Sequence, residues 1–295
     1  MPAFYAHKRF GAMVAKELPE CVRKVIHSNE ALFELGLQGP DFLFYYQPWH
    51  KNRVAAYGVR MHETPGHVFF RQAKRVLSDS SSRSAAFQTA ADETEFLDCF
   101  NAYGQRAYAY LIGFLCHFVL DSACHPYVNA MMKPTGAGHL EIEGEFEKFL
   151  LRMDGQNPLS WPVAAHIADD AQTAQTVSLF YKKITFRETE DALRDFKHYK
   201  RLLTAPFAWK QHLINLLLHI GGKYQIYKGL MLQPKDNPHC EETNQTLWKQ
   251  MQDAVGAAVE LAHELDVSVW KGAPLSARFD YDFEGIEHKA YGEEA

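Results

Sequence analysis

Apolar side chains recur at helical spacing along almost the whole chain, and no long stretch alternates apolar and polar residues as a half-buried strand would. The longest periodic segment runs from about Asp92 to Ala123, with Phe96, Leu111 and Phe118 on its apolar stripe. Residues three to four positions apart lie on one face of a helix. The pattern therefore predicts an all-α fold with this segment as its central helix.

Proline, threonine and glycine suggest where the helices begin and end. Thr64 and Pro65 are typical of an N-cap and a first helical residue, and Pro126 is predicted to end the central helix. Residues 271–295 are predicted to form an irregular tail. The 18 Gly and 13 Pro residues mark no linker, so we predict one domain over residues 1–295. Further helices are predicted over residues 5–18, 65–77, 139–151, 163–181, 188–203, 209–227 and 241–270.

Composition excludes several classes of protein. With 295 residues, 47% of them hydrophobic, the chain can bury a sizeable core. Its 31 Lys and Arg against 36 Asp and Glu lack the cationic excess of a general nucleic-acid binder. The longest apolar run, 108–120, is shorter than the roughly 20 residues of a transmembrane helix. No signal-peptide core lies in the first 20 residues and no CxxC pair occurs, which predicts a cytoplasmic protein with reduced cysteines.

Two pairs of polar residues have the spacing of metal ligands. His117 and Asp121 are four residues apart on the central helix, and His139 and Glu143 repeat this spacing on the next one. His125 follows Asp121 by four more residues. Imidazole and carboxylate groups together suit zinc or a similar divalent ion. One such pair alone is equally compatible with an ordinary hydrogen-bonded helix, so the prediction depends on the combination.

Five motifs, all within residues 1–143, carry a family resemblance: YAHKRFG around His7, GPDFLFYY around Asp41, RMH at His62, GFLCHFVLDSACHPY, and GHLEIE. In this order they resemble the bacterial zinc-dependent phospholipase C family, which shares its architecture with single-strand-specific nucleases. The resemblance implies a multi-helix phospholipase C-like bundle with a di- or trinuclear zinc site.

The resemblance also implies which residues hold the metal. It places one zinc at Asp41, His62, His117 and Asp121, a second at His125, His139 and Glu143, and a third at His7 with Asp121 bridging.

Two departures from the family pattern affect these sites. The better-known secreted members of the family separate the equivalents of Asp121 and His125 by six residues rather than four, so we expect the loop that offers His125 to be built differently. Those secreted members also complete the third site with the amine and carbonyl of an N-terminal Trp, and no Trp lies near the start of this sequence. The amine of Pro2 is a candidate substitute, and a two-metal site is an equal alternative.

A cluster of zinc ions predicts phosphodiester hydrolysis by metal-activated water. The resemblance makes Asp41 both a ligand and the candidate general base. We carry three hypotheses: a phospholipase C-like hydrolase, a hydrolase of soluble phosphodiesters or single-stranded nucleic acid, and a non-catalytic metal-binding protein. The aromatic residues that follow Asp41 are expected to form core, with a wall of the substrate pocket as the alternative. These are Phe42, Phe44, Tyr45, Tyr46 and Trp49.

Overall fold

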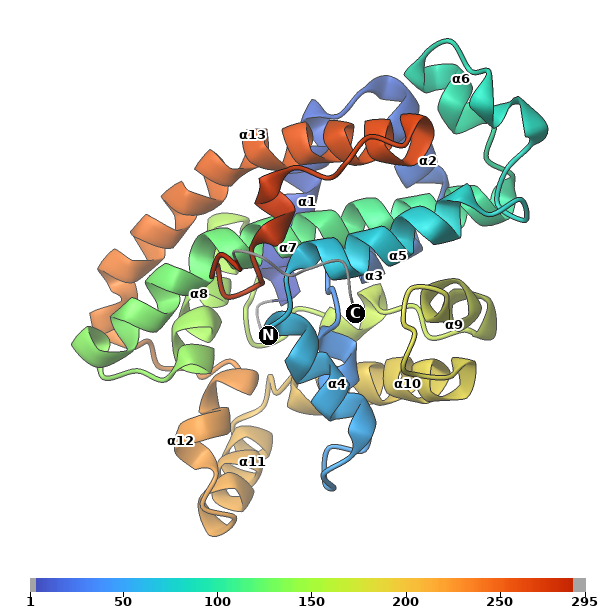
Figure 1. Cartoon of the computed structure of the whole chain (residues 1–295). Helices are drawn as coiled ribbons and strands as arrows, with labels where there is room; N and C mark the ends of the chain where they lie inside the picture. Colours follow the sequence, from blue (N-terminus) through green and yellow to red (C-terminus); the bar gives the residue numbers. More distant parts are fainter. Residues whose placement is uncertain (1–3, 289–295) are drawn as a thin grey trace.

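A computed structural model describes residues 4–288, and this part of the chain is helical, with two isolated β-bridges and no strand (Figure 1). The prediction of an all-α fold is confirmed. The α-helices are α1 (Phe4–Glu17), α2 (Glu20–Ser28), α3 (Glu30–Gly36), α4 (Arg53–His62), α5 (Gly66–Ser78), α6 (Glu93–Asp98), α7 (Ala102–Thr135), α8 (His139–Met153), α9 (Ala171–Ser178), α10 (Phe186–Leu203), α11 (Ala208–Ile220), α12 (Tyr224–Tyr227) and α13 (Glu241–Lys271).

The long helix α7 forms the centre of the fold. It runs beneath α13 in Figure 1, and it packs against α1, α3, α5 and α8 as well. By length and composition α7 is apolar enough to cross a membrane, but 89% of its most apolar window is buried inside the protein. A core helix satisfies the same criteria, so this feature is only weak evidence for a membrane span.

The backbones of α3 and α7 touch where two glycines face each other. A Cβ added to Gly36 would lie 2.2 Å from the carbonyl oxygen of Tyr110, and a Cβ added to Gly113 would lie 2.2 Å from that of Phe33. Only glycine permits so close an approach. This contact places the end of α3, and the turn that follows it, directly against α7.

The predicted central helix is wrong at both ends. The chain breaks between α6 and α7, because the Asn101 side chain accepts hydrogen bonds from the N–H groups of Tyr103 and Gly104 and starts a new helix. Helix α7 then continues through Pro126 and Pro134 to Thr135. A proline inside a helix leaves the carbonyl four residues earlier without its usual donor.

Packing from a distant segment explains why the helix survives Pro126. A Cβ on Gly285 would meet the Ser122 carbonyl oxygen and the Pro126 ring at 2.6 Å, so the C-terminal segment covers the defect. His125 therefore lies within α7, one turn after Asp121. The expected loop around His125 does not exist.

Two other predicted helices are interrupted. Residues 163–181 form a 3₁₀ turn (Val163–His166) and α9, which starts where Asp170 accepts a hydrogen bond from the N–H of Thr173. Residues 209–227 divide into α11 and α12 at Gly221 and Gly222, and Gly222 has a φ of +63° that favours glycine.

The predicted cap at Thr64 is also wrong. The Thr64 hydroxyl donates to the Arg60 carbonyl at the end of α4, and α5 begins at Gly66. A threonine hydroxyl can bond backward as readily as forward, so its sequence pattern did not decide between the two helices.

The C-terminal segment is irregular, as predicted, apart from a 3₁₀ turn at Ala277–Asp280, but it belongs to the core. Phe279 and Phe283 are fully buried, and the N–H of Phe283 donates to the carbonyl oxygen of His62. The segment thus crosses the end of α4 beside α7. Residues 289–295 of the predicted tail lie outside the described residues, and the division into one domain stays a prediction.

Candidate metal centre

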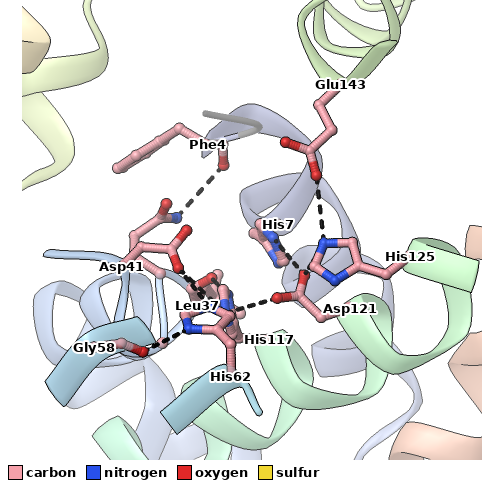
Figure 2. Close-up of polar contacts among 12 residues, drawn as sticks. Phe4, His7, Leu37, Asp41, Gly58, His62, His117, Asp121, His125 and Glu143 are labelled. Atoms are coloured by element: carbon pink, nitrogen blue, oxygen red, sulfur yellow. Dashed lines mark hydrogen bonds and ion pairs between the residues drawn. The ribbon is translucent and has the colours of Figure 1, made fainter. Parts of the chain in front are cut away.

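The fold brings all eight residues predicted to bind metal into one region, and Figure 2 shows seven of them, all except His139. Helix α7 presents three of them on successive turns, and the other five come from elements around it. Three groups have ligand atoms within 4.8 Å of one another. These groups are Asp41, His62 and His117; His7, His117 and Asp121; and His125, His139 and Glu143.

The first group joins α4, α7 and the 3₁₀ turn Asp41–Tyr45. Asp41 Oδ1 lies 3.0 Å from His62 Nε2 and 3.9 Å from His117 Nε2. A backbone hydrogen bond fixes the orientation of each imidazole. His62 Nδ1 donates to the carbonyl of Gly58, and His117 Nδ1 donates to that of Leu37. A carbonyl can only accept, so the Nδ1 atoms carry hydrogen and the Nε2 atoms face the centre.

A glycine in left-handed conformation makes the first group possible. Gly39 has a φ of +50°, and a Cβ there would lie 2.2 Å from His117 Cδ2. The turn at Gly39 and Pro40 therefore carries Asp41 past the imidazole at a distance that no larger residue allows. This is the structural reason for the GPD sequence.

The Asp121 carboxylate lies between three of the candidate histidines. Its Oδ2 lies 3.1 Å from His117 Nε2, and its Oδ1 lies 3.2 Å from His7 Nε2 and 3.9 Å from His125 Nε2. Both oxygens are buried and make no hydrogen bond of acceptable geometry within the described part of the chain, and the same holds for both nitrogens of His7. Buried polar atoms in this state are costly without a partner.

The third group lies nearer the surface, since His139 is about a quarter exposed. Glu143 Oε1 lies 3.0 Å from His139 Nε2 and 3.4 Å from His125 Nε2. Behind them, His139 Nδ1 bonds to Asn129 Oδ1, and Asn129 in turn donates to Glu284 Oε2.

Glu284 is a part of the centre that sequence reasoning missed. Its Oε1 lies 3.4 Å from His125 Nδ1, so one carboxylate supports His125 directly and His139 through Asn129. Such outer carboxylates orient metal-binding imidazoles. Glu284 follows the buried Phe283 in the C-terminal segment, where no periodic pattern or motif distinguishes it from other acidic residues.

The charges of the site favour bound cations. Burial alone raises the pKa of a carboxyl, but His117, His125 and His7 hold the pKa of Asp121 well below its usual range. His139 and His125 lower that of Glu143 to about 2 in the same way. Burial lowers the pKa of His7, and the adjacent His117 lowers it further. The region therefore combines ionised carboxylates with a neutral imidazole.

The donor set fits zinc. Oxygen and nitrogen ligands without cysteine are typical of catalytic zinc sites. With zinc bonds of about 2.1 Å, ligand atoms around a tetrahedral ion lie about 3.4 Å apart, and the nitrogen–oxygen distances here span 3.0–3.9 Å. An imidazole nitrogen and a carboxylate oxygen at such a distance repel unless a proton or a metal ion lies between them. The eight assignments remain predictions, and Pro2 lies outside the described residues.

The sequence matches the zinc-dependent phospholipase C family over residues 6–203, about two thirds of the chain. The chain belongs to this family. No curated protein and no solved structure gives a significant match. All eight candidate ligands of this zinc-dependent phospholipase C family member lie within the matched region, and the match extends well beyond the motifs in residues 1–143. Glu284 lies outside it.

The aromatic residues after Asp41 contribute mostly to the core. Phe42 and Tyr45 are buried, whereas Trp49 is 76% exposed and its indole N–H donates to the hydroxyl of Tyr199. Phe44 lies beside the His62 ring, with centroids 5.0 Å apart. The structure thus agrees with the core interpretation for Phe42 and Tyr45.

A second carboxyl of α8 holds the first helix in place. Glu147 lies one turn after Glu143, is fully buried, and accepts a hydrogen bond from the N–H of Tyr5. Burial raises the pKa of Glu147 to about 7, although Lys200 and the N–H group oppose the rise. A carboxylate at the start of α1 also faces the positive end of the helix dipole.

The raised pKa makes stability depend on pH. The folded state favours protonated Glu147, so this contribution is present below pH 4.5 and is lost as the pH rises through 7. Glu147→Gln should therefore be more stable than the wild type at pH 8 by up to about 3 kcal/mol, with a much smaller difference at pH 4.5. Urea unfolding of both proteins in chelator at the two pH values measures this. A difference independent of pH would contradict the prediction.

Proposed function

We propose that this protein is a phospholipase C that hydrolyses the phosphodiester bond between the glycerol and the head group of a phospholipid. Family membership supports a zinc-dependent hydrolase of the phosphodiesterase type. The observation that carries the proposal is the arrangement around Asp121, where three imidazoles meet one buried carboxylate. We further propose that the eight residues bind two or three zinc ions.

The groups of the protein would act on the reactants in a defined way. Bound zinc would lower the pKa of a coordinated water molecule and offset the negative charge that builds up on the phosphodiester. Asp41 would accept the proton of the attacking water, and His62 and His117 help to keep its carboxylate ionised against the effect of burial. The Gly58 and Leu37 carbonyls hold the two imidazoles in the required orientation.

Two alternatives differ in substrate or in activity. A soluble phosphodiester or single-stranded nucleic acid would use the same centre, but the net charge of −5 offers no general attraction for a polyanion. A non-catalytic metal-binding protein would hold zinc without turnover. The cytoplasmic location is likewise a proposal.

Asp41→Asn should lower the rate of phosphodiester hydrolysis at least 100-fold and leave the helical content unchanged. The near-isosteric amide fits the turn at Gly39 and Pro40, but it can neither accept a proton nor offer an anionic ligand. The measurement compares zinc-loaded wild type and variant on phosphatidylcholine, other phospholipids, nucleotide diesters and single-stranded DNA.

Asp195→Asn is a matched control, because Asp195 accepts a hydrogen bond from the N–H of Gln47 outside the centre. It should keep the wild-type rate. Zinc-loaded wild type that hydrolyses only nucleotide diesters or DNA would favour the second function, and one that hydrolyses none of the substrates would favour the third. Full activity of Asp41→Asn would exclude Asp41 from catalysis.

A further inference from the structure

Helix α11 turns its apolar face toward solvent. Trp209, Leu213, Leu216, Leu217 and Ile220 each lie three or four residues from another member of the set, so they share one side of the helix. Between 47% and 75% of each of these side chains is exposed. In a surface helix this face normally packs on the core, and a cluster of exposed apolar side chains indicates an interaction site.

The position of α11 keeps this face clear of the protein body. Figure 1 shows α11 and α12 as a hairpin that projects away from α7 and α13. The short α12 is the main packing partner of α11, and Gln211 is the one buried residue of the helix, held by a hydrogen bond to the carbonyl of Ala205. Phe207, just before the helix, is 61% exposed as well.

The sequence segment that contains the hairpin has a charge opposite to that of the whole chain, although Lys197 and Lys228 form ion pairs with Asp169 and Glu141. Residues 196–235 contain seven Lys and Arg and not one Asp or Glu, although the chain has a net charge of −5. Arg201 and Lys223 are exposed, and no ion pair involving them occurs in the described part of the structure. Apolar side chains with tryptophan, flanked by cations, are typical of helices that lie in the interface of an anionic membrane.

We propose that the α11–α12 hairpin is a docking surface for an anionic lipid bilayer, with the five apolar residues of α11 entering the head-group region. Arg201 and Lys223 would contact lipid phosphates. A second copy of the chain fits less well, since a symmetric pair would bring the same cationic segment against itself. The proposed docking surface includes no residue of the metal centre, so membrane docking can be tested independently of the proposed hydrolase activity.

Vesicle cosedimentation tests this surface without requiring turnover. The wild type should bind vesicles of phosphatidylcholine and phosphatidylglycerol at least 10-fold more tightly than vesicles of phosphatidylcholine alone. The double variant Leu217→Gln and Ile220→Gln should lose at least 10-fold in binding to the anionic vesicles, because it removes apolar surface that enters the bilayer. Both side chains are exposed, so the variant should fold normally, as circular dichroism can verify.

Matched controls separate the surface from general effects. Val68→Gln removes an exposed apolar residue of α5, and Lys249→Glu reverses an exposed charge on α13, whereas Lys223→Glu reverses one on the hairpin. Of these three single variants, only Lys223→Glu should weaken binding of the protein to anionic vesicles. Asp41→Asn should bind vesicles like the wild type, which distinguishes docking from catalysis.

Three results would overturn the proposal. The first is a wild type that does not bind anionic vesicles, and the second is a double variant that binds them as tightly as the wild type. The third is a wild-type dimer in solution that the double variant dissociates, because a second copy would then cover α11. If hydrolysis of phospholipids is absent while vesicle binding follows the pattern above, the docking surface holds and the proposed function fails.

Discussion

Asp121→Asn should remove at least one equivalent of bound zinc and lower the rate of phosphodiester hydrolysis by at least 1,000-fold. The Asp121 carboxylate faces the imidazoles of His7, His117 and His125 at 3.1–3.9 Å and is fully buried. An amide at this position has no negative charge to share between ions, and its NH₂ group would compete for the imidazole lone pairs.

Elemental analysis and thermal unfolding measure this effect directly. A chelator should lower the Tm of the wild type, because zinc binds the folded state, and it should shift the Tm of Asp121→Asn much less. Asp266→Asn is the matched control. Asp266 is also buried, but burial raises its pKa well above the usual range, and the hydroxyl of Tyr108 donates to it. Burial favours the uncharged form of Asp266, and the residue lies outside the metal centre, so an amide there should leave zinc content and rate unchanged.

An Asp121→Asn protein that retains its full zinc content and rate would refute the central role of Asp121.

Elemental analysis of alanine variants tests the two histidines of the third group in the same way. His125→Ala should affect zinc content more than His139→Ala, since His125 contacts both Asp121 and Glu143.

Gly113→Ala should destabilise the protein by about 3 kcal/mol, the upper end of the range typical when a methyl group is forced into a fully packed contact. The added Cβ would lie 2.2 Å from the Phe33 carbonyl oxygen and 2.9 Å from the backbone nitrogen of Leu37. Both atoms belong to the backbone, so no side-chain rotation can relieve the clash. Helix α3 would have to move away from α7.

Gly256→Ala, which also replaces a glycine by alanine, should raise the stability of the protein rather than lower it. Gly256 lies within α13, and a Cβ there meets no atom within 4 Å. Alanine should therefore stabilise α13 by up to about 1 kcal/mol through its higher helix propensity. Denaturant unfolding of the two variants and the wild type measures both effects. A Gly113→Ala protein within 1 kcal/mol of the wild type would show that α3 and α7 are not in tight contact.

The stability of the α3–α7 contact and the binding of zinc are linked through the turn that leaves α3. Leu37 accepts the hydrogen bond from His117 Nδ1 through its carbonyl, and Gly39 passes over the His117 ring. A shift of α3 would therefore move the groups that orient His117. We expect Gly113→Ala to weaken zinc binding in addition to lowering stability.

Local patterns in the sequence determined the helical class and most of the ligand geometry. His117 and Asp121 meet because residues four apart on a helix are neighbours, and the same holds for His139 and Glu143. The order of the motifs added Asp41, His62 and His7, and the family match confirmed the resemblance on which those residues depend. None of these inferences required knowledge of contacts between distant segments.

Only the tertiary structure decided the features that depend on such contacts. The sequence pattern placed a helix end at Pro126, but Gly285, which lies 159 residues later, packs over the exposed carbonyl and the helix continues through His125. Glu284 reaches His125 from the same segment. The propensity of a single proline changes the local free energy of a helix by a few kcal/mol. Burial of the C-terminal segment against α7 outweighs it, and a local pattern contains no information about that burial.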